Sequence, residues 1–296
     1  MRTVFLGTSD FAVAVLGRLA ASPHRPALVV TRPDRPRGRG RRLAPPPAAQ
    51  AGRELGIAVL QPRSVNDEEA RAAIAAARPD TVCVCAFGGL IREPLLSAYP
   101  MLNVHPSLLP RWRGAAPVER AIMAGDVETG VSIIRVVQAL DAGPVCAERS
   151  EPVHPHDTYG TLAPRLQRIG GDLLVEVLDD QPPCREQDHA HATYAEKIGP
   201  EDRVLHPDRT PAENERVVRA LNPHIGARVA RDGHQPLRVC AAAIRADVRD
   251  VPAGTLVARD GRLLYGCADG ALELLEVQPS GGRRMEAAAF LRGHAV

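Results

Sequence analysis

Asn103 and His105 lie two residues apart in the segment LNVHPSLLPRWRGAAP, residues 102–117. Side chains two positions apart on a strand project from the same face, so the amide and the imidazole would stand side by side. An amide can bind a developing oxyanion and an imidazole can carry a proton, which is the chemistry of acyl transfer. Two buried polar residues that the neighbouring backbone satisfies would show the same spacing. The spacing alone does not separate these interpretations.

A carboxylate, Asp141, follows in the segment QALDAGP, residues 138–144. Apolar stretches on either side predict strands at 130–137 and 145–151, with Asp141 in a tight loop between them. An Asp close to a Gly is most often a turn former. Local chemistry alone therefore favours a turn residue here.

The elements that must position these residues begin as a βαβ unit, with strands at 3–6 and 27–31 around a helix at 11–21. Further helices are predicted at 48–55, 68–77, 115–124 and 157–180, and further strands at 57–60 and 80–86. This alternation predicts an α/β fold with a doubly wound, Rossmann-like, mostly parallel sheet. Only Gly7 stands in the first βα turn, so the G-x-G-x-x-G pattern of dinucleotide-binding proteins is missing.

A ligand crevice is expected where the parallel strands end. The strand at 80–86 runs into Phe87, Gly88, Gly89, Leu90 and Ile91. Paired glycines after a strand allow the backbone to approach a ligand closely.

The pattern changes towards the C-terminus. A helix is predicted at 211–221, short strands at 228–230, 237–244, 255–258, 262–267 and 271–277, and a last helix at 285–291. Asp260 and Gly261 mark a tight hairpin, and closely spaced short strands suggest a small β-barrel of the OB type. We expect three parts: residues 1–187, a linker at 188–206, and a C-terminal OB-like domain at 207–296.

Composition excludes several classes of protein. No apolar run approaches the ~18 residues of a membrane span, and the N-terminus does not read as a signal peptide, so a cytoplasmic protein without membrane contact is expected. The six Cys show no C-x-x-C or metal-ligand spacing, so we expect reduced thiols, without disulfide or zinc. Four His, at 154, 156, 189 and 191, fall in polar loops and are expected to be solvated. No heptad or exposed apolar repeat suggests an interface, so a monomer is expected.

A basic segment, RPDRPRGRGRR at residues 32–42, holds six Arg and one Asp and so carries +5, whereas the whole chain carries only +2. Its Pro and Gly predict an exposed loop without regular structure. The segment could bind phosphates of a nucleic acid. It could equally be a solvated loop, because Arg supplies all but one of the 37 basic residues.

Several motifs together resemble the folate-dependent formyltransferase family, and within it the methionyl-tRNA formyltransferases. The resemblance covers nearly the whole chain, in order: FLGTSDFA, TRPDRPRGRGRRLAPPP, NVHPSLLPRWRGAAPVERAIMAGDVETGVSI, LDAGPV, TYAEKI, LNPHIGA and QPSGGRRM. Small departures are Ser9 and Pro106, where Pro and a small residue respectively are usual, and Arg for Lys at Arg41, Arg42, Arg283 and Arg284. The Arg-rich segment and QPSGGRRM are typical of the enzymes that act on tRNA.

The resemblance implies a catalytic triad and two binding regions. The implied catalytic residues are Asn103, His105 and Asp141. Folate binding is implied for Phe87, Gly88, Gly89, Leu90, Ile91, Ser107, Leu108, Leu109 and Pro110. Contact with tRNA is implied for Arg35, Arg37, Arg39, Arg41, Arg42, Arg283 and Arg284, together with the C-terminal domain.

The implied reaction moves a formyl group from 10-formyltetrahydrofolate to the α-amino group of initiator methionyl-tRNA, a step of translation initiation. No metal is implied. Asn103 and His105 would handle the oxyanion and the proton, and Asp141 would assist. The alternatives are a sugar-nucleotide formyltransferase with the same triad, and a non-catalytic RNA-binding protein.

Overall fold

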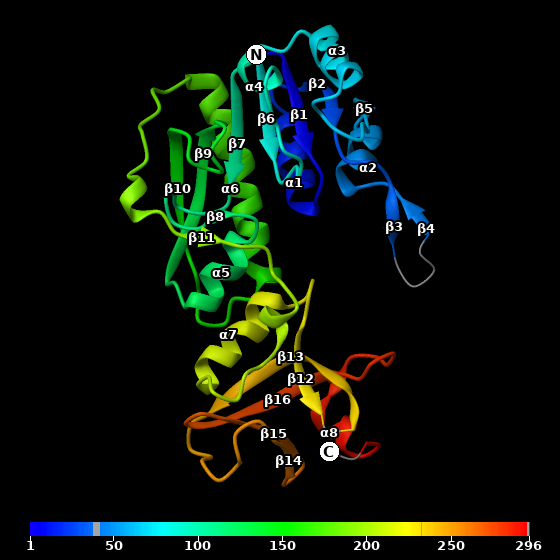
Figure 1. Ribbon diagram of the computed structural model, residues 1–296, viewed down its shortest axis with the longest axis vertical. Helices are drawn as coiled ribbons and strands as arrows, with labels where there is room; N and C mark the ends of the chain where they lie inside the picture. Colours follow the sequence, from blue (N-terminus) through cyan, green and yellow to red (C-terminus); the bar gives the residue numbers. More distant parts are fainter. Residues whose placement is uncertain (38–41, 232, 295) are drawn as a thin grey trace. The chain divides into compact units, whose positions relative to one another are not determined.

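The computed structural model describes residues 1–37, 42–231, 233–294 and 296, and it divides into two compact units. The first unit is Met1–Gly114, Glu128–Pro152 and Ala163–Tyr194, and the second is Ala115–Val127, Val153–Leu162 and Ala195–Val296. Figure 1 shows their elements. The boundaries expected from the sequence, with a linker at 188–206, stay a prediction.

The first unit is built on a seven-stranded sheet with the order β10-β9-β7-β6-β1-β2-β5 (Figure 1). Neighbours from β7 to β5 are parallel, while β9 pairs antiparallel with both β7 and β10. This confirms the predicted mostly parallel sheet. The strands are β1 (Thr3–Gly7), β2 (Pro26–Val30), β5 (Ala58–Leu60), β6 (Thr81–Cys85), β7 (Met101–His105), β9 (Glu128–Arg135) and β10 (Val145–Pro152).

Helices cover both faces of this sheet, as a doubly wound fold requires. On one face lie α1 (Asp10–Ala20), α2 (Pro47–Glu54) and α6 (Tyr159–Asp180), where a Cβ at Gly170 would come within 2.7 Å of Val104 in β7. On the other face, α3 (Glu68–Ala77) and α4 (Leu95–Ala98) supply Ile74 and Leu95 to a buried cluster with Val4 and Leu6. Side chains of β1 thus alternate between two cores.

Part of the basic segment is regular, contrary to the irregular loop that its Pro and Gly predict. β3 (Arg35–Arg37) and β4 (Arg42–Ala44) pair antiparallel, with Pro36 opposite Leu43. Prolines are tolerated in edge strands, and both strands of a two-stranded ribbon are edges, so Pro36 is compatible with the pairing. Residues 38–41, including Arg39 and Arg41, lie outside the described residues.

The second unit contains an antiparallel, barrel-like sheet of order β12-β13-β16-β15-β14, with β17 paired to β16. Residues 285–291 do not form one helix, because Met285 pairs with Val277 before α8 begins. The elements are α5 (Pro117–Ala124), η2 (Glu201–Arg203), α7 (Pro211–Leu221), β12 (Ala227–Arg231), β13 (His234–Arg245), β14 (Leu256–Arg259), β15 (Arg262–Cys267), β16 (Gly270–Gln278), β17 (Met285–Glu286) and α8 (Ala287–Leu291).

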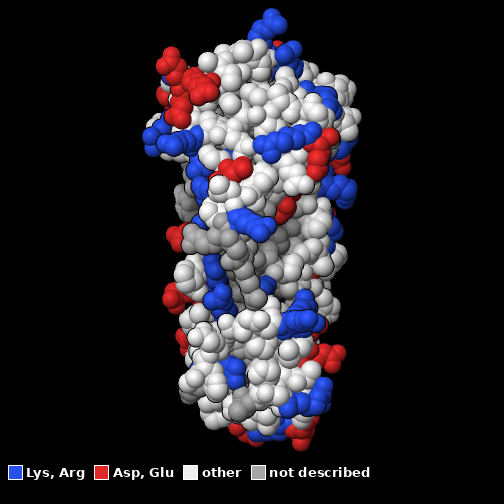
Figure 2. Space-filling view, turned by 90° about the vertical axis from the view of Figure 1, so that its right-hand side faces the viewer, with Lys and Arg blue, Asp and Glu red and all other residues white. Residues whose placement is uncertain are grey.

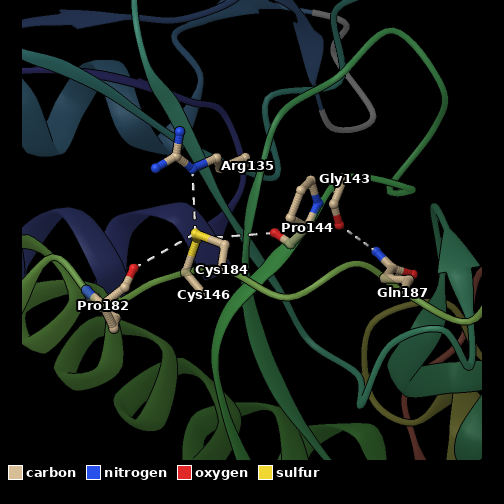
Figure 3. The surroundings of a disulfide bond; sticks show 7 residues. All are labelled: Arg135, Gly143, Pro144, Cys146, Pro182, Cys184 and Gln187. Atoms are coloured by element: carbon tan, nitrogen blue, oxygen red, sulfur yellow. Dashed lines mark hydrogen bonds between the residues drawn. A yellow bond between two sulfur atoms is a disulfide. The ribbon is translucent and has the colours of Figure 1, made fainter.

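One expectation about the cysteines is wrong, because Cys146 and Cys184 form a disulfide (Figure 3). The two residues are 38 positions apart, and no local pattern marks them as partners. They meet because Val145, at the start of β10, forms a β-bridge with Arg185, beyond the end of α6.

The other four cysteines are free and buried. Cys83 and Cys85 lie in the central strand β6, where burial raises the pKa of Cys83 to about 12 and that of Cys85 further still. Both therefore stay neutral and behave as small apolar side chains, as their place in an apolar strand predicts.

Within the described residues, no helix is long and apolar enough to cross a membrane. The same residues contain no group of three or more His, Cys, Asp or Glu that could hold a metal ion.

Candidate active site

Asn103 and His105 project from the same face of β7, and both reach Asp141. The distance from Asn103 Nδ2 to Asp141 Oδ1 is 3.4 Å, and His105 Nδ1 lies 3.6 Å from Asp141 Oδ2. The two strand residues sit at the end of β7, beside β6 on one side and β9 on the other. The structure therefore brings together the three side chains that the sequence singles out.

Asp141 lies in a short loop, residues 139–143, which we call the Asp141 loop. Its φ of 48° is left-handed, a conformation that few residues other than Gly, Asn and Asp adopt readily. Oδ2 accepts a hydrogen bond of 2.9 Å from the main-chain N–H of Gly114. At the end of the loop, a Cβ on Gly143 would lie 1.8 Å from the carbonyl oxygen of Arg135, so only glycine fits there. Asp141 is thus both a turn residue and a member of the group that it forms with Asn103 and His105.

The imidazole of His105 is buried, and its orientation is fixed. Nε2 lies 2.8 Å from the main-chain oxygen of Trp112. A carbonyl oxygen only accepts, so Nε2 must carry a hydrogen. In the neutral imidazole the other nitrogen, Nδ1, then turns a lone pair towards Asp141.

The turn after β7 is held by serines. Ser132 Oγ donates to the oxygen of Ser107 at 2.8 Å and accepts from the N–H of Leu109 at 3.1 Å. Ser107 Oγ donates to the oxygen of Arg111, and Leu109 packs against Ile134 and Val145. The Leu109–Pro110 peptide bond is cis. The side chains of Ser107 and Leu109 are therefore engaged inside the protein.

The glycine-bearing segment, residues 87–91, follows β6, the neighbour of β7 in the sheet. Thr8 Oγ1 donates to the oxygen of Phe87, and Asn66 Nδ2 donates to the oxygen of Leu90, so the backbone of the segment is held at two points. Gly88 has a φ of 66° and open space around it, while a Cβ on Gly89 would strike the Phe87 ring. Leu90 is 62% exposed.

Comparison with known proteins places the chain in a family. A family model for formyl transferases matches residues 1–178, and a model for the formyl transferase C-terminal domain matches residues 197–295. A methionyl-tRNA formyltransferase of Methylococcus capsulatus is 43% identical over 302 residues, which cover 100% of this chain and 98% of the relative. The chain belongs to the methionyl-tRNA formyltransferase family.

Two solved structures share the fold. Methionyl-tRNA formyltransferase from Clostridium thermocellum superposes with a TM-score of 0.61 at 16% identity, covering 83% of this chain and 94% of that one. HypX from Aquifex aeolicus, in complex with tetrahydrofolic acid, superposes with a TM-score of 0.67 at 18% identity. The match covers 98% of this chain and 47% of HypX, so the chain spans about half of that protein.

The arginines expected to contact tRNA lie in separate segments of the chain. Arg35, Arg37 and Arg42 lie in the β3–β4 hairpin, with Arg35 and Arg42 exposed. Arg283 is exposed, and Arg284 is paired with Glu276. Figure 2 shows basic and acidic side chains interspersed on the face in view. On this face (Figure 2) basic side chains are separated by neutral and acidic ones, in keeping with the small net charge of +2.

The sequence did not indicate several groups that contact Asn103, His105 and Asp141. The oxygen of Trp112 and the N–H of Gly114 are main-chain groups, whose role residue type does not reveal. Gln187 donates to the main-chain oxygens of Asp141 and Gly143, and it lies far along the chain without a recognisable motif. No pattern in the sequence could have singled it out.

Proposed function

We propose that this chain transfers the formyl group of 10-formyltetrahydrofolate to the α-amino group of methionine on initiator tRNA. The observation that carries the proposal is the convergence of Asn103, His105 and Asp141 at the end of a parallel strand. The formyl carbon forms a bond to the amine nitrogen as its bond to N10 of the folate breaks, and the proton that the amine loses ends on N10. The protein supplies hydrogen-bond donors and a route for that proton. The full-length similarity to the Methylococcus capsulatus enzyme favours tRNA as the carrier of the acceptor.

Asn103 is assigned to the formyl oxygen. As the amine attacks the formyl carbon, negative charge develops on that oxygen. An amide nitrogen has two hydrogens, of which one points to Asp141 Oδ1, so the other is available to the oxyanion. A donor fixed in place before the reaction stabilises such charge without reorganisation.

His105 and Asp141 are assigned to the proton that the attacking amine must lose. When the imidazole is neutral, Nδ1 of His105 and Oδ2 of Asp141 are both acceptors, 3.6 Å apart, so the pair can gain one proton. Asp141 would take the proton directly or through a water molecule and pass it to Nδ1 of His105, so that an imidazolium then faces the carboxylate. Since Nε2–H is already bound to Trp112, His105 fits the role of proton carrier better than that of a second oxyanion donor.

The folate is assigned to the segment 87–91 and the turn 107–110. An exposed apolar Leu90 beside the open backbone of Gly88 suits a flat, partly apolar ring system. Ser107 and Leu109 would shape the site from within, because their side chains have partners in the protein. Contact with the ligand would fall to Leu108, Pro110 and main-chain groups.

The tRNA is assigned to Arg35, Arg37, Arg39, Arg41 and Arg42, with Arg283 and Arg284. Guanidinium groups on a narrow hairpin suit phosphate binding, because each can form two hydrogen bonds to one phosphate. Arg284 would have to give up its ion pair with Glu276, so Arg283 is the better placed of that pair.

The decisive experiment is an acceptor profile of the purified protein with 10-formyltetrahydrofolate. We expect rapid formation of formylmethionyl-tRNA from aminoacylated initiator tRNA, and none from an amino-sugar nucleotide. Preferential formylation of the amino-sugar nucleotide would overturn the assigned acceptor. Tight tRNA binding without turnover of either acceptor would support a non-catalytic RNA-binding protein instead.

A further inference from the structure

Gln187 is a buried residue of the first unit whose side chain uses every hydrogen bond it can make. Nε2 donates to the main-chain oxygens of Asp141 at 2.8 Å and Gly143 at 2.7 Å. Oε1 accepts from Nε and Nη2 of Arg113 at 3.1 and 2.7 Å. A glutamine amide has two donor hydrogens and two acceptor lone pairs, so nothing is left over for solvent or ligand.

Arg113 links the Gln187 amide to the segment that contacts His105 and Asp141. Arg113 is 4% exposed, and its Nη2 also lies 2.8 Å from Nδ1 of His189. Its chain neighbours are the two main-chain groups that bind the triad, Trp112 at His105 and Gly114 at Asp141. Gln187 therefore bridges the segment that orients the imidazole and the loop that carries the carboxylate.

Apart from Gln187, the Asp141 loop is held by one internal bond, from Ala142 N–H to the oxygen of Ala139 at 3.3 Å, and by the bonds that Gly114 and Asn103 make to the carboxylate. Asp141 is left-handed, and in the loop sequence 139–143 the exposed Leu140 contributes no buried side chain. The two bonds from Gln187 fix the carbonyl oxygens on both sides of Ala142, and hence the direction in which the Asp141 side chain leaves the backbone.

The segment that precedes Gln187, residues 184–185, is itself held in place. Val145 and Arg185 exchange two main-chain hydrogen bonds of 2.8 and 2.9 Å, and the Cys146–Cys184 disulfide joins the residues next to them. Figure 3 shows Gln187 reaching Gly143 beside this disulfide.

We propose that Gln187 is a positioning residue that sets the place of the Asp141 carboxylate relative to Asn103 and His105. It has no bond to any of the three side chains and acts through the backbone of the Asp141 loop. The proposal rests on the proposed formyl transfer, since it assigns Gln187 to the same site. A buried amide that served stability alone would leave the geometry of the triad, and so the chemical step, unchanged.

Two variants distinguish the bonds that Gln187 donates to the Asp141 loop from those that it accepts from Arg113. Gln187→Met keeps the volume and removes all four bonds, whereas Gln187→Glu keeps the acceptor for Arg113 and removes both donors to the loop. Gln50→Met is the matched control, because Gln50 is exposed on α2 and its side chain bonds with Glu54 on the same helix. The readouts are steady-state formylation over a range of pH and amide hydrogen exchange of residues 139–143.

In both variants of Gln187 we expect kcat to fall about 10- to 100-fold, the size of effect that a displacement of ~1 Å produces. KM for 10-formyltetrahydrofolate should stay constant, the pH profile of kcat should shift, and exchange in the Asp141 loop should accelerate. Gln50→Met should match the wild type. The hydrogen-exchange readout needs no turnover, so it tests the positioning even if the wild type formylates neither acceptor.

Unchanged hydrogen exchange in the Asp141 loop of Gln187→Met would overturn the proposal, whatever the activity. So would wild-type kcat in Gln187→Glu, since that result would assign the role to Arg113 alone. A wild type without turnover would instead overturn the proposed function, and the two failures are therefore distinguishable.

Discussion

The Oδ2 atom of Asp141 and the Nδ1 atom of His105 face each other at 3.6 Å, and each group has a second main-chain partner that fixes its direction. Gly114 N–H holds the carboxylate and the Trp112 oxygen holds the imidazole. His105 on β7 and Asp141 in the Asp141 loop are thus held close enough to share a proton.

Replacing Asp141 by Asn should remove the proton acceptor while keeping the size of the side chain. We expect kcat for formylmethionyl-tRNA formation to fall about 10²- to 10⁴-fold, the usual contribution of a positioned acid or base. The KM for both substrates should change little. Asp180→Asn, at the exposed end of α6, is the control and should keep full activity. Wild-type turnover in Asp141→Asn would remove Asp141 from the catalytic group.

Asn103→Ala tests the oxyanion donor. Loss of one such donor typically lowers kcat by about 10²–10³-fold. The melting temperature should stay within a few degrees, because Asn103 is only half-buried and its contact with Asp141 is long, at 3.4 Å. Stopped-flow or radiolabel assays of formylmethionyl-tRNA measure the effect. An equal loss of tetrahydrofolate affinity would instead show that Asn103 acts in binding.

The β3–β4 hairpin gives a prediction about salt. The double variant Arg35→Ala/Arg42→Ala should weaken tRNA binding and flatten its dependence on salt. The slope of log K against log salt should fall by about 0.7–0.9 for each phosphate that the variant no longer neutralises. Arg168→Ala, which removes an arginine that is 70% exposed on α6, is the control and should leave the slope unchanged. A slope equal to that of the wild type would show that these two arginines are solvated and do not bind tRNA phosphates.

Much of the fold could be predicted because it depends on local patterns. The period of two in β7 predicts that Asn103 and His105 share a face, and the chain order of strands and helices predicts a parallel sheet. Within such a sheet, the glycines after β6 and the imidazole at the end of β7 come to the same edge. These features need no knowledge of distant contacts.

The features that could not be predicted depend on which segments meet in space. Pro36 and its neighbours look irregular until β4 is known to pair with them. Cys146 and Cys184 meet only because Val145 bridges to Arg185. Gln187 matters through carbonyl oxygens, which every residue has, so its residue type carries no signal.

The Cys146–Cys184 disulfide should contribute to stability. Closing a loop with a sequence separation of 38 is worth about 4 kcal/mol in the chain-entropy model. Reductant should therefore lower the melting temperature of the wild type by several degrees, at ~2–4 °C for each kcal/mol. Cys184→Ser serves as the control, since its melting temperature should not respond to reductant. Free thiols at both positions in non-reducing peptide mapping would contradict the prediction.

The buried thiols of β6 predict a loss of stability at alkaline pH. Burial raises the pKa of Cys83 from 9.0 to about 12 in the folded protein. Between these values the unfolded chain releases a proton that folded Cys83 retains, so the free energy of unfolding falls as the pH rises above about 9. The slope is about 1.4 kcal/mol for each pH unit and thiol.

Urea unfolding of wild type and Cys83→Ala from pH 8 to pH 10.5 measures this slope. The variant should be less stable at pH 8 because it leaves a cavity, yet the difference between the two proteins should shrink as the pH rises. A constant difference would show that Cys83 titrates alike in the folded and unfolded chains.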